Sequence, residues 1–411
     1  MNARLTASTW KVSRVTVSQD KITVEGLTGD AAIAHALKQC DVDVLAAYPI
    51  TPQTIIVEDF QKFAADGEVH TRVIPVESEH SAMSACVGAS AVGARVATAS
   101  ASAGLALMWE ILYCAASMRM PIVFTVANRA LSAPINIHND HSDGMGMRDS
   151  GFIQLYCQSS QEAYDTTIMA FKLAEDHDVL LPVMVGIDGF IVSHNVERVE
   201  MLPDDEIKEF LGVRVPVQPL DPKNPITMGP LALTDYYFEF KEQQDRAMGR
   251  VIKNYKKVEA EFKKLTGRSY GMFETYKTKD ADIIILAMSS MGGTAKAVAD
   301  VLREQGEKIG VVRLKMFRPF PAMDIAKAVS GAKAVMVFEK AMSFGAVTHP
   351  LAMEVRSALY DLEKKPLVTD FVVGLGGRDV PPETFVEGIE MTKKYIEKGK
   401  APLYETLGVR K

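Results

Sequence analysis

VDVLAAYPITPQT (Val42–Thr54) and RVIPVESEHSAMSAC (Arg72–Cys86) are the two segments that decide the fold of this chain. The first opens with the apolar run Val42–Ala47, which is typical of a buried parallel strand. Pro49 and Pro52 then fix their own φ angles and keep the residues before them out of the helical region, so the strand ends in a rigid loop. Open α/β sheets bind ligands at such strand ends.

The second segment brings polar side chains to the same edge. Thr71–Val76 predicts another strand, which leads directly into a helix predicted over Glu79–Val92. Because the carboxyl ends of neighbouring parallel strands meet at one edge of a sheet, we expect Thr51, Glu77 and Glu79 at one rim. We interpret this rim as half of an active site.

Apolar runs alternate with helical segments along most of the chain. Further strands are predicted at residues 95–99, 121–127, 152–156 and 182–187, and a second series begins at Asp282 with IIILA, IGVVR, AVMVFE and LVTDFVVG. This alternation is typical of parallel, doubly wound sheets. The sequence therefore predicts an α/β protein with two doubly wound parallel-sheet domains joined by a linker and a long helix.

The chain divides into segments of different character. The extension that precedes the first domain alternates in places, which fits a hairpin, an edge strand or an arm on a partner chain. The linker has repeated prolines without a clear period, and a charged helix suited to a strut or an interface follows it. The segments are an N-terminal extension (1–24), a first domain (25–200), a linker with the long helix (201–280) and a second domain (281–411).

Composition restricts the classes of function. The 411 residues carry a formal net charge of −6, which disfavours nucleic acid as a partner. The four cysteines form no C-x-x-C pair, so neither a zinc ribbon nor an iron–sulfur cluster has a local signature. No signal sequence or membrane-spanning run is recognisable, and we expect a cytoplasmic protein with reduced thiols and no membrane association.

Several sequence motifs, taken in their order along the chain, resemble one protein family. They are YPITP, ESEHSA, TASASAGL near Thr98, VANRALSAPINI from Val126, DHSDGMGMRDSGFIQL from Asp140 and LPVMVGIDGFIVSH from Leu181. Together they resemble the α subunits of pyruvate:ferredoxin oxidoreductases, among the 2-oxoacid:ferredoxin oxidoreductases. PFP near Arg318 and GLGGRD near Gly374 are similar to the second domain of that family. One departure is Ala103, which stands where the family commonly has glutamine.

The resemblance implies a shared cofactor site. The first domain is similar to the pyrimidine-binding half of a thiamine diphosphate site, and the second to the C-terminal domain of transketolase. Such enzymes hold the diphosphate and Mg²⁺ with a Gly-Asp-Gly motif, which this chain lacks. A β subunit is therefore expected to complete the site. The resemblance also implies [4Fe-4S] clusters on partner subunits, a γ subunit, a ferredoxin-like δ subunit, and ferredoxin as the electron acceptor.

The implied reaction is the oxidative decarboxylation of pyruvate. Coenzyme A is the co-substrate, the products are acetyl-CoA, CO₂ and reduced ferredoxin, and the reverse direction makes pyruvate. Another 2-oxoacid, a branched-chain 2-oxoacid or oxalate, stays open as the substrate.

The resemblance also assigns roles at the rim. Glu79 matches the glutamate that hydrogen-bonds the cofactor's pyrimidine and promotes the imino tautomer that deprotonates the thiazolium C2, although a helix start also favours glutamate. Thr51 matches a hydrogen-bond donor to substrate, or it caps a helix. Arg129 matches the arginine that binds the 2-oxoacid carboxylate, or it forms a structural ion pair. Cofactor contacts are implied for Glu79, Tyr48, Pro49 and Ile50.

The loop His138–Asp143 supports a rival class. Its closely spaced histidines and aspartates suit a metal-dependent hydrolase. However, the spacing matches no hydrolase pattern and no H-E-x-x-H helix accompanies it, so no metal ligand is predicted in this chain. We expect the loop to close over the active site or an interface. A third reading is a non-catalytic scaffold subunit.

Overall fold

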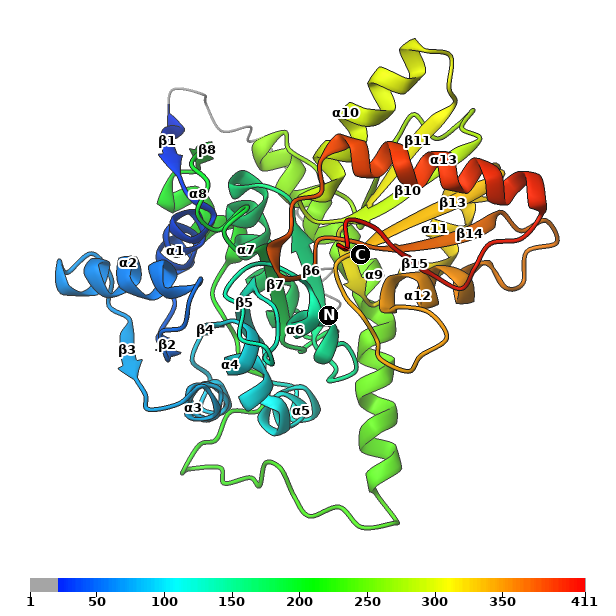
Figure 1. Ribbon diagram of the computed structural model, residues 1–411. Coiled ribbons are helices and arrows are strands. Elements are labelled where there is room, and N and C mark those ends of the chain that lie inside the picture. The colour runs from blue at the N-terminus through cyan, green and yellow to red at the C-terminus, as the bar shows by residue number, and fades with distance from the viewer. Residues whose placement is uncertain (1–20, 411) are drawn as a thin grey trace, which may run out of the picture.

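Two sheets, each covered by helices on both faces, form the architecture (Figure 1). The computed structural model describes residues 21–410. A seven-stranded sheet has the order β12-β6-β7-β5-β4-β2-β3, and a six-stranded sheet has the order β15-β14-β13-β10-β11-β9. Most neighbours within each sheet are parallel. The prediction of an α/β fold with two doubly wound units is confirmed.

The first sheet is built from short apolar runs buried on both faces, as parallel sheets require. Its parallel strands are β2 (Val44–Ala47), β3 (Arg72–Pro75), β4 (Val96–Ser100), β5 (Ile122–Asn128), β6 (Ile153–Cys157) and β7 (Val183–Asp188). One face is covered by α1 (Gly29–Gln39), α2 (Thr54–Ala65) and α7 (Ser160–Glu175). The other face is covered by α3 (Glu79–Ala91) and α5 (Trp109–Ser117), with α4 (Ser102–Leu107) and α6 (Ser142–Gly146) at the carboxyl edge.

The second sheet repeats this arrangement. Its strands are β9 (Phe273–Tyr276), β10 (Ile283–Met288), β11 (Ile309–Leu314), β13 (Ala334–Glu339), β14 (Leu367–Val372) and β15 (Glu405–Thr406). Its helices are α10 (Met291–Glu304) and α13 (Pro382–Lys398) on one face, and α11 (Ala322–Val329) and α12 (Pro350–Leu359) on the other (Figure 1).

Several elements differ from the sequence-based expectation. The segment after β4 forms two short helices, α4 and α5, which meet at Met108. The proline-containing linker begins with a helix, α8 (Asp204–Leu211), before the long α9 (Tyr237–Thr266). β9 was not predicted and lies antiparallel on β11. β12 (Met316–Arg318), from the second half of the chain, lies antiparallel on β6 of the first sheet.

The N-terminal expectation is resolved in part. β1 (Thr23–Leu27) forms an antiparallel two-stranded sheet with β8 (Glu197–Met201), so residues 23–27 take the edge-strand alternative. Residues 1–20 of the expected extension lie outside the described residues. Within residues 21–410, no helix combines the length and the apolar character that crossing a membrane requires.

The two sheets share a core and a buried ion group. Apolar side chains of α3 and β5 pack in one continuous cluster with those of β10 and α12. Beside this cluster, the fully buried carboxylate of Glu162 on α7 accepts hydrogen bonds from Lys315 Nζ at 2.7 Å and Arg313 Nη1 at 3.1 Å. The two halves of the chain are therefore joined by both apolar and ionic contacts.

Candidate functional site

The candidate site lies where the strand order of the first sheet changes direction. β2 has β3 on one side and β4 on the other, although the chain visits them in the order β2, β3, β4. Such a switch point leaves a crevice at the carboxyl ends of the strands, where ligands bind in open α/β sheets. The YPITP loop follows β2, and the loop that leads to α4 follows β4.

The YPITP loop is fixed by contacts on its buried side, whereas other residues of the loop are exposed. The fully buried side chain of Gln53 donates from Nε2 to the carbonyl of Tyr48 at 2.9 Å. Pro52 packs so closely on Gly189 that a Cβ there would lie 2.9 Å from Pro52 Cγ. Tyr48 and Thr51 remain exposed. The loop is thus held in one conformation with its polar groups facing outward.

Glu79 begins α3 and is almost completely buried. Ser78 caps the helix by accepting a hydrogen bond from the backbone N–H of Ser81 at 3.3 Å. Only 6% of Glu79 is exposed, and its carboxylate has no hydrogen-bond partner among the described residues. Neither oxygen of Glu79 is completely buried, so the carboxylate keeps a small opening through which a ligand can reach it.

Gly104 makes room for that carboxylate. A Cβ at Gly104 would overlap Glu79 Oε1 and would lie 2.5 Å from Ser100 Oγ. Ser100 Oγ and Thr98 Oγ1 are buried and have no partner in the described part of the chain. Gly104, the Glu79 carboxylate and the unpartnered Ser100 hydroxyl therefore meet at the end of β4.

The other polar groups at the start of α3 form local hydrogen bonds. Glu77 is exposed and accepts a hydrogen bond from Ser81 Oγ, which lowers the pKa of the Glu77 carboxyl. The backbone carbonyl of His80 accepts from Ser84 Oγ at 2.8 Å. Glu77 thus reaches the rim as expected but lies in solvent, unlike Glu79.

Arg129 connects two loops of the rim. Its guanidinium donates from Nη1 to the carbonyl of Thr51 at 2.9 Å and from Nε to the carbonyl of Asn136 at 2.9 Å. The side chain is 5% exposed, and its Nη2 donates to no group within residues 21–410. Arg129 therefore forms no carboxylate ion pair there and keeps a donor group available.

Asp143 holds the backbone of the rim together. Its Oδ2 accepts from the backbone N–H groups of Ser102 and Arg129, both at 2.9 Å, and its Oδ1 accepts from Asn128 Nδ2 at 2.8 Å. Complete burial raises the pKa of the Asp143 carboxyl to about 6, although these hydrogen bonds act in the opposite direction. Asp143 thereby fixes the end of β5 against the start of α4.

The loop His138–Asp143 does not form a metal centre. His141 Nε2 lies 2.8 Å from Asp188 Oδ1, and Asp140 accepts from the backbone N–H of Gly376 at 3.2 Å. Within residues 21–410, no group of three or more His, Cys, Asp or Glu side chains is placed to hold a metal ion. The described residues therefore give no support to the hydrolase reading. The side chains of His141 and Asp140 instead contact Asp188 and Gly376.

The structure brings some of the predicted residues together directly. Thr51 contacts Arg129 through its carbonyl, whereas Glu79 approaches Gly104 instead. Sequence reasoning gave no role to Gly104 or Gln53, and it considered Asp143 only as part of the possible metal-binding loop. The glycine in the small-residue loop after β4 was a usable signal for the first, because glycine at a strand end often marks a close approach.

Fold and site together define a class: an α/β protein with a candidate ligand site at the switch point of a doubly wound sheet, attached to a second α/β domain. Comparison with known families makes this specific. Residues 35–260, more than half of the chain, match the model described as pyruvate flavodoxin/ferredoxin oxidoreductase, thiamine diphosphate-binding. Residues 281–385 match the model described as pyruvate:ferredoxin oxidoreductase core domain II.

Similar proteins agree with these matches. The chain is 53% identical to a pyruvate synthase subunit, PorA, of Thermotoga maritima, over 89% of this chain and 93% of that one. It is 47% identical to the corresponding PorA subunit of Methanocaldococcus jannaschii, over 92% and 96%. A ketoisovalerate oxidoreductase subunit, VorA, of Pyrococcus horikoshii is 42% identical over 91% and 95%.

Two solved structures share the fold at low identity. A 2-oxoglutarate:ferredoxin oxidoreductase from Magnetococcus marinus has a TM-score of 0.72 at 18% identity, and the match covers 92% of this chain and 65% of that one. A split-gene transketolase has a TM-score of 0.54 at 14% identity, covering 91% and 99%. The chain belongs to the pyruvate flavodoxin/ferredoxin oxidoreductase family and is a subunit of a 2-oxoacid:ferredoxin oxidoreductase. The resemblance noted in the sequence is thereby confirmed.

Proposed function

We propose that this chain supplies the pyrimidine-binding half of a thiamine diphosphate site in an enzyme that oxidatively decarboxylates pyruvate. The reaction uses coenzyme A and ferredoxin and can run in reverse as pyruvate synthesis. The observation that carries the proposal is the buried carboxylate of Glu79, which faces Gly104 and has no partner among the described residues. The functions of the relatives, which are named pyruvate synthase subunits, support the choice of reaction.

The residues around Glu79 fit the aminopyrimidine of the cofactor. A Cβ at Gly104 would fill the space beside the Glu79 carboxyl, and the neighbouring Ser100 Oγ is a buried polar group without a partner among the described residues. When bound, thiamine diphosphate supplies a thiazolium carbon that acts as nucleophile and electron sink. Glu79 exchanges a proton with the pyrimidine ring, and Tyr48, Pro49 and Ile50 pack against the cofactor.

Arg129 and Thr51 act on the substrate. The free Nη2 of Arg129 suits one oxygen of a 2-oxoacid carboxylate, because guanidinium–carboxylate hydrogen bonds are charge-assisted. Of its other two bonds, the one from Nη1 fixes the Thr51 backbone and the one from Nε fixes Asn136, so that the exposed Thr51 hydroxyl is held beside the same substrate group. Asp143 positions the backbone of Arg129 and touches neither substrate nor cofactor.

The remaining parts of the site belong to partner subunits. The chain has no Gly-Asp-Gly motif, so a β subunit binds the diphosphate and Mg²⁺. The [4Fe-4S] clusters that carry electrons to ferredoxin lie on partners, which include γ and ferredoxin-like δ subunits. We place the complex in the cytoplasm and assign residues 25–200 to the cofactor domain, 201–280 to the linker and helix, and 281–411 to the second domain.

Reconstitution tests this function. The purified chain should turn over no 2-oxoacid alone and should become active with its β, γ and δ subunits, coenzyme A and ferredoxin. A panel of pyruvate, 3-methyl-2-oxobutanoate and oxalate then decides the substrate, since one relative acts on ketoisovalerate by name. Turnover by the isolated chain would refute the shared site, and a clear preference for another 2-oxoacid would refute pyruvate.

A further inference from the structure

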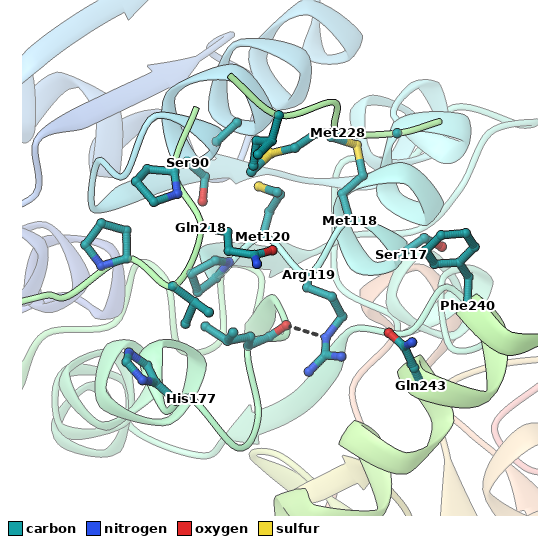
Figure 2. Close-up of a pocket in the computed structure, with 18 of the residues that line it drawn as sticks. Ser90, Ser117, Met118, Arg119, Met120, His177, Gln218, Met228, Phe240 and Gln243 are labelled. Atoms are coloured by element: carbon teal, nitrogen blue, oxygen red, sulfur yellow. Dashed lines mark hydrogen bonds between the residues drawn. The ribbon is translucent and has the colours of Figure 1, made fainter. Parts of the chain in front are cut away.

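A cavity of about 640 Å³ lies at the opposite edge of the first sheet from the candidate site. The segment that covers it, residues 212–236, is called the strap here. The cavity is lined by Met118–Pro121 immediately before β5, by Leu180 before β7, and by the strap and the start of α9 (Figure 2). Its volume is in the range of pockets that bind small molecules.

The charge of this lining is strongly positive. Arg119, Arg214, Lys241 and Arg250 line the cavity, whereas the net charge of the whole chain is −6. Glu175 is the one carboxylate among the lining residues of the described chain. Both of its oxygens accept hydrogen bonds from Arg95, at 2.8 and 2.9 Å, so one carboxylate offsets only part of the positive charge of the lining.

Arg214 has a donor group to spare, whereas Arg119 donates from Nε to the carbonyl of Leu180 at 3.0 Å and from Nη2 to that of Val179. Arg214 Nη1 is buried without a partner among the described residues, and its Nη2 reaches only Ser90 Oγ at 3.5 Å. Burial and the nearby charge of Arg250 both lower the pKa of Arg119. Cations that repel each other, together with an unpaired guanidinium nitrogen, are stabilised by a bound anion.

Apolar groups complete the pocket. Met118, Met120 and Met228 line it beside Arg119, as Figure 2 shows. Methionine side chains adapt their shape to apolar and aromatic groups. The lining therefore combines a cationic region with an apolar surface.

We infer that this cavity binds a small organic anion, with a phosphate or carboxylate group held by Arg214 and Arg119 and an apolar body held by the methionines. The strap covers this anion site, which is separate from the candidate site at the carboxyl edge. The lining residues Met118–Pro121 lie immediately before β5, and Arg129 follows the far end of that strand.

The probe for this site is 1-anilinonaphthalene-8-sulfonate, an anion with an aromatic body, titrated into the full chain by calorimetry and fluorescence. We expect one site whose affinity falls with salt. Arg214→Gln should weaken binding roughly tenfold or more, the loss of one charge-assisted hydrogen bond. Arg246→Gln is the matched control, because Arg246 lies on α9, is largely exposed and pairs with Glu242 outside the cavity.

Competition identifies the anionic group. Displacement of the probe by pyrophosphate indicates a phosphate ligand, and displacement by octanoate indicates a carboxylate on an alkyl body. Thermal unfolding of each variant shows whether it folds, and Arg250→Gln replaces Arg214→Gln if the latter does not. No binding, equal loss in the Arg246 control, or displacement by neither competitor would overturn the assignment.

Discussion

Two buried glutamates, Glu79 and Glu162, occupy similar places and have opposite surroundings. Each lies in the first turn of a helix that packs on the first sheet. Glu162 is surrounded by partners: Lys315, Arg313 and the backbone N–H of Gln158, which donates to Oε2 at 3.0 Å. Glu79 has no partner among the described residues and instead faces the space left by Gly104.

The difference separates a structural carboxylate from one prepared for a ligand. Burial alone would raise the pKa of Glu162, but the charges of Lys315 and Arg313 outweigh it and lower that pKa to about 2. Glu162 is therefore ionised near neutral pH, and its interactions with Lys315 and Arg313 join the two domains. Glu79 has no fixed counter-charge among the described residues and faces the space beside Gly104.

The largest effect is expected at Glu79. Glu79→Gln keeps size and a hydrogen bond but cannot exchange a proton, and general acid–base catalysis is worth about 10²–10⁴-fold. Turnover of the reconstituted complex should fall on that scale while the melting temperature of the chain stays near that of the wild type. A variant that lost stability instead would place Glu79 with Glu162 among structural carboxylates.

The next effect is on stability. Glu162→Gln leaves Arg313 and Lys315 without their counter-charge in a buried site, which should lower the free energy of unfolding by about 3–5 kcal/mol. Urea unfolding measures this. Glu274→Gln is the control, because Glu274 also pairs with Arg313 but is partly exposed, and it should cost about 1 kcal/mol or less. Similar losses in both variants would contradict the special role of the buried pair.

Arg129 should give a smaller effect, on substrate recognition. Arg129→Lys keeps the charge but loses the fork that binds Thr51 and the substrate together, and the loss of a charge-assisted hydrogen bond is about 1.5–3 kcal/mol. We expect a higher KM for pyruvate with unchanged cofactor content. If KM is unchanged while subunit assembly is lost, Arg129 is structural.

The pH dependence of stability gives the smallest effect. Because the folded pKa of Glu162, about 2, lies below its usual value of 4.5, its contribution is complete above about pH 4.5 and is lost as pH falls through about 2. The slope from one such group is at most about 1.4 kcal/mol per pH unit. Unfolding curves between pH 5 and 2 should show this slope in the wild type and lack it in Glu162→Gln. An identical slope in both would show that Glu162 is not the source of the pH dependence of stability.

The rim was predictable where it depends on local sequence. Pro49 and Pro52 restrict the backbone directly, and the cap at Ser78 is a local preference, so the loop after β2 and the start of α3 could be located. Gly104 and Asp143 could not be assigned, because their roles arise from contacts between the ends of different strands.

Pairing across the domains was also beyond local patterns. β12 contains three residues, Met316–Arg318, which is too short for a recognisable period, and it pairs with a strand more than 150 residues earlier. The partners of Glu162 could not be predicted from the sequence for the same reason. Arg313 and Lys315 lie at the end of β11 and beyond it, and only the packing of one domain on the other brings them to α7.

The rate of C2–H exchange of thiamine diphosphate bound in the reconstituted complex tests the central claim most directly, because it isolates proton transfer from electron transfer. Glu79→Gln should slow this exchange by about 10²–10⁴-fold. Glu77→Gln, two residues away and exposed, should exchange at the wild-type rate. Unimpaired exchange in the Glu79 variant, with cofactor bound, would contradict the assignment of Glu79 as the proton-transferring carboxylate.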